Sequence, residues 1–137
     1  MIILDTNVLS DLAKVDHSLH LADWYATEPG EVVVSAISVA EIEMGIAVMP
    51  RGARRDMKAR HVREMLDDGL DGAVIPFDRA AAEQYGAVVA ARRRAGRPIS
   101  VPDAQIAAIC RARNATLATR NVRDFEHTGI TVFDPSS

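Results

Sequence analysis

The sequence contains one cysteine and no long apolar run, and these shortages exclude several kinds of protein. Because Cys110 is the only cysteine, the chain can form neither an internal disulfide nor a zinc site built from cysteines. No apolar stretch approaches the length of a membrane-spanning helix. The apolar opening at residues 1–4 is too short for a signal peptide and lacks its basic flank. We therefore expect a cytoplasmic protein that does not associate with membranes.

Several common catalytic motifs are also missing. The sequence has no glycine-rich phosphate loop, no dinucleotide-binding fingerprint and no Gly-x-Ser-x-Gly nucleophile elbow. The histidines show no paired spacing that would bind a metal; they are His17, His20, His61 and His127. Nucleotide binding, nucleophilic catalysis and histidine-based metal binding are therefore poor explanations of this chain.

Short apolar runs alternate with stretches of helical periodicity along the whole chain. The expected strands are residues 2–5, 32–35, 73–77, 116–119 and 130–133. The expected helices are about 6–14, 19–27, 39–49, 53–68, 79–95 and 101–113, with a helical turn at 122–125. This alternation predicts an α/β fold with three α/β/α layers and a mostly parallel central sheet of about five strands. Its length and composition predict one domain over residues 1–137.

Charged residues are distributed unevenly along the sequence. Residues 1–50 contain eight acidic side chains and one basic side chain, Lys14. Residues 51–137 contain fifteen basic side chains, mostly arginine, and eleven acidic ones. The asymmetry weakly indicates a nucleic acid or an acidic partner, although solvated helix faces explain most single arginines equally well.

Four carboxylates occupy the places where a parallel-sheet enzyme keeps its active site. Asp5 ends the first strand, Glu41 lies early in the helix after the second, Asp103 opens a helix, and Asp124 follows the fourth strand. Ligands bind outside the carboxyl ends of such strands, so we expect these acids to converge. Converging acids repel one another unless a cation holds them, and carboxylate oxygens suit Mg²⁺ or Mn²⁺.

Each acid also has a simpler explanation. Asp5 can cap the following helix, Asp103 is favourably placed at a helix N-terminus, and Asp124 can belong to a surface turn. Helical spacing provides an argument that these acids do not occupy their positions by coincidence. It places Glu41 on an apolar face with residues such as Met44 and Val48. By the same spacing, Asp103 shares a face with Ile106, Ala107 and Cys110, and we interpret Cys110 as a core thiol beneath the site.

Four motifs in order along the chain resemble those of PIN-domain toxins of the VapC/FitB type. They are Met-Ile-Ile-Leu-Asp5-Thr6-Asn7, Ser38-Val-Ala-Glu41 with Gly45, Gly96-Arg97-Pro98-Ile-Ser-Val-Pro102-Asp103, and Leu-Ala-Thr119-Arg-Asn121-Val-Arg-Asp124. The resemblance covers essentially the whole chain and implies a PIN-like domain. One departure is Pro102, where many relatives have a less rigid residue, but proline suits the first turn of a helix.

The resemblance implies an Mg²⁺- or Mn²⁺-dependent endoribonuclease that hydrolyses RNA phosphodiester bonds through metal-activated water. Asp5, Asp103 and Asp124 would hold one or two ions, and Glu41 would bind through a water or orient the attacking one. Short polar side chains beside these ligands would support them: Thr6, Asn7, Thr119 and Asn121. Arginines that would guide the RNA backbone are Arg92, Arg97, Arg120 and Arg123.

The resemblance also implies partners. The toxin would pair with a small VapB-like antitoxin and reach operator DNA only through it. Exposed apolar residues expected on helices near 39–66 and 80–95 add to the expectation of a two-fold homodimer, with a heterotetramer or larger assembly once antitoxin is bound.

Two other functions fit parts of this sequence. One is a phosphatase or receiver domain that forms an aspartyl-phosphate. The phosphatase would need an acid where Asn7 stands, and the receiver would need a lysine late in the chain, whereas the last lysine is Lys58. The other is a non-catalytic module that binds an antitoxin and co-represses an operon. Loss of an acid would favour that reading, and all four acids are present.

Overall fold

In the computed structural model, which describes residues 1–136, five parallel strands form one sheet in the order β3-β2-β1-β4-β5. The strands are β1 (Ile2–Leu4), β2 (Val32–Ser35), β3 (Val74–Ile75), β4 (Thr116–Ala118) and β5 (Thr131–Phe133). β1 is central, with Ile3 paired to Val33 on one side and to Leu117 on the other. The predicted parallel sheet of about five strands is therefore confirmed.

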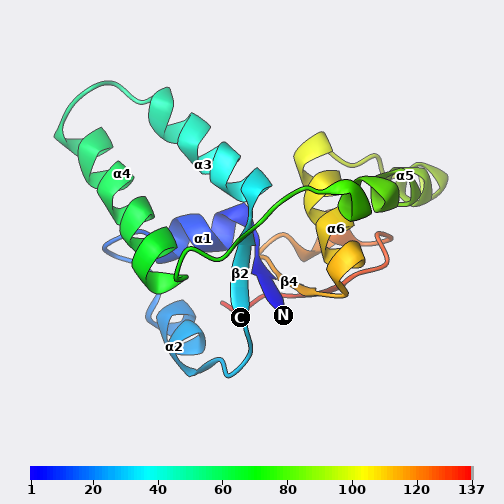
Figure 1. Cartoon of the computed structure of the whole chain (residues 1–137), viewed down its shortest axis with the longest axis horizontal. Helices are drawn as coiled ribbons and strands as arrows, with labels where there is room; N and C mark the ends of the chain where they lie inside the picture. Colours follow the sequence, from blue (N-terminus) through cyan, green and yellow to red (C-terminus); the bar gives the residue numbers. More distant parts are fainter. Residues whose placement is uncertain (137) are drawn as a thin grey trace.

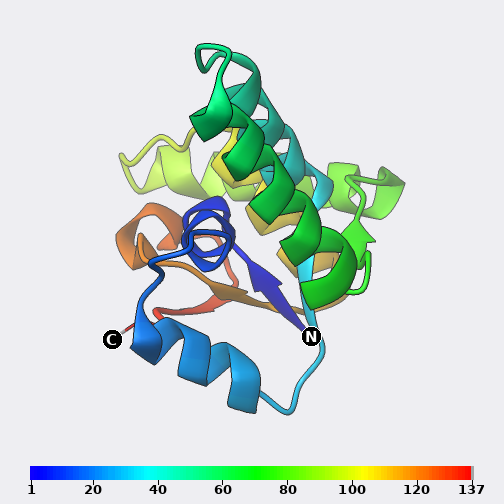
Figure 2. The same cartoon turned by 90° about the vertical axis from the view of Figure 1, so that its left-hand side faces the viewer.

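Helices cover both faces of this sheet, so the three-layer α/β/α prediction is also confirmed. They are α1 (Thr6–Leu12), α2 (Leu19–Thr27), α3 (Ala36–Ala47), α4 (Ala53–Glu64), α5 (Arg79–Arg94) and α6 (Val101–Arg113). A π-helical turn, Met65–Gly69, extends α4, and a 3₁₀ turn lies at Val122–Phe125. α5 and α6 lie on one side of the sheet and α1, α3 and α4 on the other (Figure 1). In both views α3 and α4 run side by side, away from the sheet (Figures 1 and 2).

The strand period of two produces two separate cores. Ile3, Val33 and Leu117 point to the face covered by α5 and α6, where Val88 and Ile106 meet them. The next residue on each strand points to the opposite face; these are Leu4, Val34 and Ala118. There they meet α1 to α4, including Leu9, Leu21, Ile42 and Val62. Burial on both faces explains why β1 and β2 read as continuous apolar runs.

The edge strand β3 is shorter than the sequence predicts. It pairs only at Val74 and Ile75, against an expected range of 73–77. Pro76 follows at once, and proline has no backbone N–H with which to continue a ladder. Most other boundaries lie within one or two residues of the prediction, and those of β2, α2, α6 and the turn at 122–125 coincide with it.

Cap residues place several helix starts at one rim of the sheet. Asp5 caps α1 directly after β1, and Ser35 caps α3 directly after β2. Ser100 caps α6, which has Pro102 in its first turn and ends at Asn114 in the left-handed conformation, with φ 51°. The carboxyl ends of the central strands therefore meet the first turns of α1 and α3. Within residues 1–136, no helix combines the length and apolar character needed to cross a bilayer.

The buried face of α6 generates a test of the fold. Ile106 is fully buried in the core beneath the rim, whereas Val101 on the same helix is 58% exposed. Ile106→Ala should lower the free energy of unfolding by about 2–5 kcal/mol, because it removes buried methyl groups and leaves a cavity. Val101→Ala should change it by less than about 0.5 kcal/mol. Urea unfolding followed by circular dichroism measures both, and equal effects would contradict the described packing of α6.

Candidate active site

Asp5 occupies the centre of the rim and is almost fully buried, at 5% exposure. Its Oδ1 accepts a hydrogen bond from the backbone N–H of Thr6 at 2.8 Å, and its Oδ2 accepts one from the Thr119 hydroxyl at 2.7 Å. Asp5 is thus the N-cap of α1, as the simpler explanation expects. Burial nevertheless raises the pKa of its carboxyl; the hydrogen bonds oppose that shift, while nearby Glu41 and Asp124 add to it. Capping and membership of an acidic cluster therefore coexist at one residue.

Glu41 reaches this centre through the Thr6 hydroxyl, which donates to Glu41 Oε1 at 2.7 Å. The same hydroxyl lies 2.8 Å from Ser38 Oγ, so α1 and α3 are joined at the rim by a hydroxyl pair. The apolar face expected around Glu41 needs correction, because Met44 and Val48 are 61% and 74% exposed. Glu41 is half-buried, and the Thr6 hydroxyl bonds its carboxylate at the start of α3.

Asp103 lies in the first turn of α6, where its backbone N–H donates to Ser100 Oγ at 3.3 Å. The predicted buried stripe beneath it is confirmed, since Ile106, Ala107 and Cys110 are all fully buried. Partial burial, together with the charges of the other three acids, raises the pKa of Asp103 to about 6. Cys110 is a core thiol, as expected, and burial raises its pKa to about 12. It is therefore protonated and unsuited to nucleophilic chemistry.

Asp124 sits in the exposed 3₁₀ turn after β4. Its backbone N–H donates to the carbonyl of Asn121 at 3.0 Å, so the turn itself orients the residue. Its charge raises the pKa of both Asp5 and Asp103. The surface-turn explanation is thus right about the backbone but incomplete, because the carboxylate acts electrostatically on the rim.

The structure therefore places all four predicted acids within electrostatic reach of one another. The charges of Asp5, Asp124 and Glu41 all raise the pKa of Asp103, although the four residues lie on four different segments of the chain. Their oxygens are the donor type that Mg²⁺ and Mn²⁺ prefer, and mutual repulsion is what a bound cation would relieve. Among residues 1–136 no three acidic, histidine or cysteine side chains already stand in metal-ligand geometry. The chemistry of the donor set fits a divalent cation, while the side chains are not drawn together as ligands.

The predicted supporting residues form one polar network around Asp5. Asn7 Nδ2 lies 3.4 Å from Asp5 Oδ2 and 3.5 Å from Thr119 Oγ1. Thr119 in turn accepts the backbone N–H of Asn121 at 3.0 Å. Asn121 belongs to the network through this backbone contact, and the residue itself is exposed to solvent. The network ties α1 to the loop after β4, and so holds Asp5 between the two segments.

The four predicted RNA-binding arginines have different surroundings. Arg123 is exposed. Arg97 pairs with Glu126, and Arg120 Nη2 lies 2.6 Å from Oδ2 of the buried Asp11. Arg92 is only 5% exposed, and its guanidinium donates hydrogen bonds to backbone carbonyls. The prediction that Arg92 contacts RNA is therefore corrected.

Sequence reasoning missed that Arg92 faces inward and that Asp11 holds Arg120. For Arg92 a signal was available in the spacing of α5. Ala81 and Val88 are the other buried residues of that helix, and Arg92 follows Val88 by four positions. Three consecutive arginines, at positions 92–94, suit the C-terminus of a helix, and this pattern does not distinguish the single inward one.

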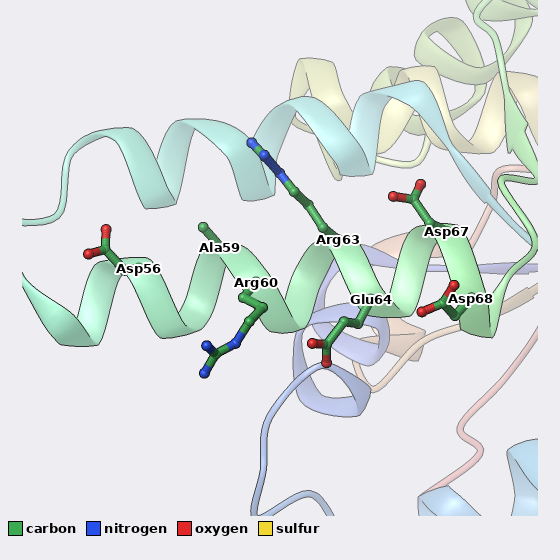
Figure 3. A pocket seen from close by; sticks show the side chains of 7 residues that line it. All are labelled: Asp56, Ala59, Arg60, Arg63, Glu64, Asp67 and Asp68. Carbon is green, nitrogen blue, oxygen red and sulfur yellow. The ribbon is translucent and has the colours of Figure 1, made fainter.

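A separate pocket of about 450 Å³ lies along α4 and the π-helical turn. It is lined by Asp56, Ala59, Arg60, Arg63, Glu64, Asp67 and Asp68. These side chains project from different sides of the helix, and acids lie before and after the two arginines (Figure 3). None of the four rim acids takes part in this lining, so the acid cluster is not part of this pocket.

Comparison of the sequence with known proteins identifies the family of this chain. The PIN domain model matches residues 2–130. The plasmid stability protein StbB of Pseudomonas syringae pv. tomato is 37% identical over 136 residues, which cover 98% of each chain. The VapC ribonuclease Y4jK of Sinorhizobium fredii is 35% identical, over 98% of this chain and 97% of that protein.

Solved structures agree with the sequence matches. A structure of FitAB bound to an IR36 DNA fragment superposes with a TM-score of 0.88 at 28% identity, covering 100% of this chain and 96% of the other. The PIN-like fold expected from the sequence is thus confirmed, as is the resemblance to proteins of the VapC/FitB type. The chain belongs to the PIN domain family.

Proposed function

We propose that the protein is a metal-dependent endoribonuclease and the toxin of a VapBC-type toxin–antitoxin pair. One observation carries the proposal: Asp5, Glu41, Asp103 and Asp124 lie close enough to raise the pKa of two of their number. Such an arrangement destabilises the empty rim and is offset by a cation. The 35% identical relative is named a VapC ribonuclease, which supports RNA as the substrate.

In this proposal Asp5, Asp103 and Asp124 hold the ion, Mg²⁺ or Mn²⁺. When bound, such an ion lowers the pKa of a water molecule and offsets negative charge on the scissile phosphate. The protein's own part is to keep the carboxylates in place. Thr119 and the N–H of Thr6 fix the two oxygens of Asp5, and the capped first turn of α6 carries Asp103. These contacts fix the carboxylate of Asp5 and the backbone that carries Asp103.

Glu41 has a different part in the proposal. Its carboxylate is oriented by the Thr6 hydroxyl at 2.7 Å rather than by a backbone cap, and it lies at the edge of the cluster. A carboxylate in that position can accept a proton from the attacking water and hold that water in line with the phosphorus. Arg97 and Arg123 lie on the segments around Asp124 and α6, where they would attract the RNA backbone, whereas Arg120 is paired with Asp11 and would contribute less.

The competing functions account for less of this geometry. An aspartyl-phosphate phosphatase needs an acid at position 7, but Asn7 there donates to Asp5 and helps to hold Thr119. A non-catalytic co-repressor has no use for four acids that repel one another at the rim. Both remain outcomes of the experiments below.

We further propose that a VapB-like antitoxin is the partner and that operator DNA is reached through it. The neighbouring structure is of FitAB bound to a DNA fragment, at 28% identity over the whole of this chain. Apolar side chains exposed on α3 and α4, such as Met44, Val48 and Met57, provide surface for protein contacts.

Asp5→Asn tests the proposed function directly. The change keeps the size and capping ability of the side chain but removes one charge from the cluster. Stability of the metal-free protein should hold or rise, while Mg²⁺ affinity and RNA cleavage fall together, by at least about 10–100-fold. Cleavage of a mixed RNA pool with Mg²⁺, Mn²⁺ or EDTA, alongside thermal melting, measures all three quantities.

Asp16→Asn, at an exposed acid before α2, is the matched control and should behave as wild type. In a host without antitoxin, wild-type protein should arrest growth and Asp5→Asn should not, at equal soluble yield. Full cleavage in EDTA, or an Asp5→Asn protein as active and metal-responsive as wild type, would rule out the proposed mechanism.

The raised pKa values predict how stability depends on pH without metal. Asp103 binds its proton more tightly in the folded protein, at a pKa of about 6, than at the ordinary value of 3.8. The unfolded state therefore releases its proton first, and stability should fall as pH rises from about 4 to about 6. Asp103→Asn should make that fall smaller, whereas Asp16→Asn should leave it unchanged. Urea unfolding in EDTA across this pH range is the measurement, and a stability that rises equally in all three proteins would contradict the acidic cluster.

The exposed apolar residues predict a homodimer. Light scattering at micromolar concentration should give twice the chain mass for the purified protein. Val48→Asp, at a valine 74% exposed on α3, should shift the mass toward a monomer, because it places a charge on the proposed contact. Leu19→Asp, at a residue 81% exposed on α2, is the control and should remain dimeric. A wild-type monomer would refute the expected assembly.

A further inference from the structure

Arg92 is the one basic side chain that is buried among residues 1–136, at 5% exposure. Its Nε donates to the carbonyl of Arg97 at 2.6 Å, and its Nη2 lies 3.5 Å from the carbonyl of Pro98. Its Nη1 donates to the carbonyls of Asp124 and Glu126, both at 2.8 Å. One guanidinium therefore joins two backbone segments that are far apart in sequence.

Both of those segments lead to acids of the rim. The segment at 97–98 runs directly into Ser100, whose side chain caps α6 and thereby orients the turn that carries Asp103. The other segment contains Asp124 itself, and the acceptor is that residue's own carbonyl. The position of each acid's backbone thus depends on the same buried cation.

Burying a guanidinium is costly unless its N–H groups are used, and carbonyl oxygens here meet that requirement. None of the ion pairs among the described residues includes Arg92, and its guanidinium instead donates to backbone carbonyls. A planar fork with five donors can serve acceptors on two segments at once. The three donors of a lysine ammonium diverge from a single nitrogen and cannot reproduce that spacing.

We propose that Arg92 is a positioning residue for the metal site, fixing the segment of Asp124 against the start of α6 so that the carboxylates of Asp124 and Asp103 face one cation. This inference rests on the proposed function, since it concerns the acids proposed there as ligands. It assigns no contact between Arg92 and RNA or metal. The effect is transmitted through the carbonyl of Asp124 and through the segment at 97–98.

Arg92→Lys is the test, because it keeps the positive charge and most of the side-chain volume. Mn²⁺ affinity, measured without RNA by electron paramagnetic resonance, should weaken about tenfold, as for other residues that support a metal ligand. In cleavage assays kcat should fall while KM for RNA changes little. Arg93→Lys, the same substitution at the exposed neighbouring position, should leave Mn²⁺ affinity unchanged. Wild-type Mn²⁺ affinity in a folded Arg92→Lys protein would overturn the proposal.

A double-mutant cycle separates positioning from a general loss of stability. If Arg92 acts through Asp124, then Arg92→Lys should weaken Mn²⁺ binding much less in an Asp124→Asn background than in wild type. Equal effects in the two backgrounds would mean that Arg92 only supports the fold, and would overturn the proposal.

Pro98→Gly provides a second variant should Arg92→Lys fail to fold. It leaves Arg92 intact and loosens the exposed segment between the guanidinium and α6. It should weaken Mn²⁺ binding in the same direction, and unchanged affinity would count against the proposal. Failure of the proposed function looks different, because wild-type protein would then neither bind Mn²⁺ nor cleave RNA.

Discussion

Repulsion among carboxylates at the rim of the sheet is the constraint to which the rest of this structure responds. Asp5 is buried at the end of the central strand, where an ionised carboxylate is costly, and Glu41 and Asp124 make it more so. Two hydrogen bonds to the ionised form, from Thr6 and Thr119, offset part of that cost. A fold that optimised only its stability would place an apolar or neutral side chain there. The proposed cation site accounts for the presence of these acids.

The contacts that stabilise the helices also position the acidic residues. Asp5 is a helix cap, and Ser100 is the cap of the helix that carries Asp103. The Thr6 hydroxyl that bonds Glu41 belongs to the first turn of α1 and also contacts Ser38 in the first turn of α3. Because caps stabilise helices independently of any ligand, the backbones that carry Asp5 and Asp103 are positioned without one.

The sequence was sufficient to predict what depends on local pattern. Caps, apolar periodicity and the glycine and proline breaks predicted nearly all elements, and the position of each acid at a strand end or helix start predicted the cluster. Strand order was not predictable, because it depends on long-range pairing such as that of β1 with β4. The face of Glu41 was misread because Met44 and Val48, at core-like spacing on a helix, are exposed instead. Spacing reveals which residues share a face, not whether another layer covers that face.

The arginine excess after residue 50 illustrates how tertiary structure redirects a compositional signal. Arg92 donates hydrogen bonds to backbone carbonyls, and Arg111 donates to Gln84 and to the carbonyl of Thr128. Arg120 forms an ion pair with Asp11. These cations hold segments together. The charge left for the proposed contact with RNA is therefore smaller than the count of arginines implies, and it lies on exposed residues such as Arg93, Arg94 and Arg123. In the proposed function, affinity for RNA would then depend less on a broad basic surface than on the rim itself. A cation bound by the acids would make the local electrostatic potential positive there. That potential would attract a phosphate of the RNA to the acidic cluster.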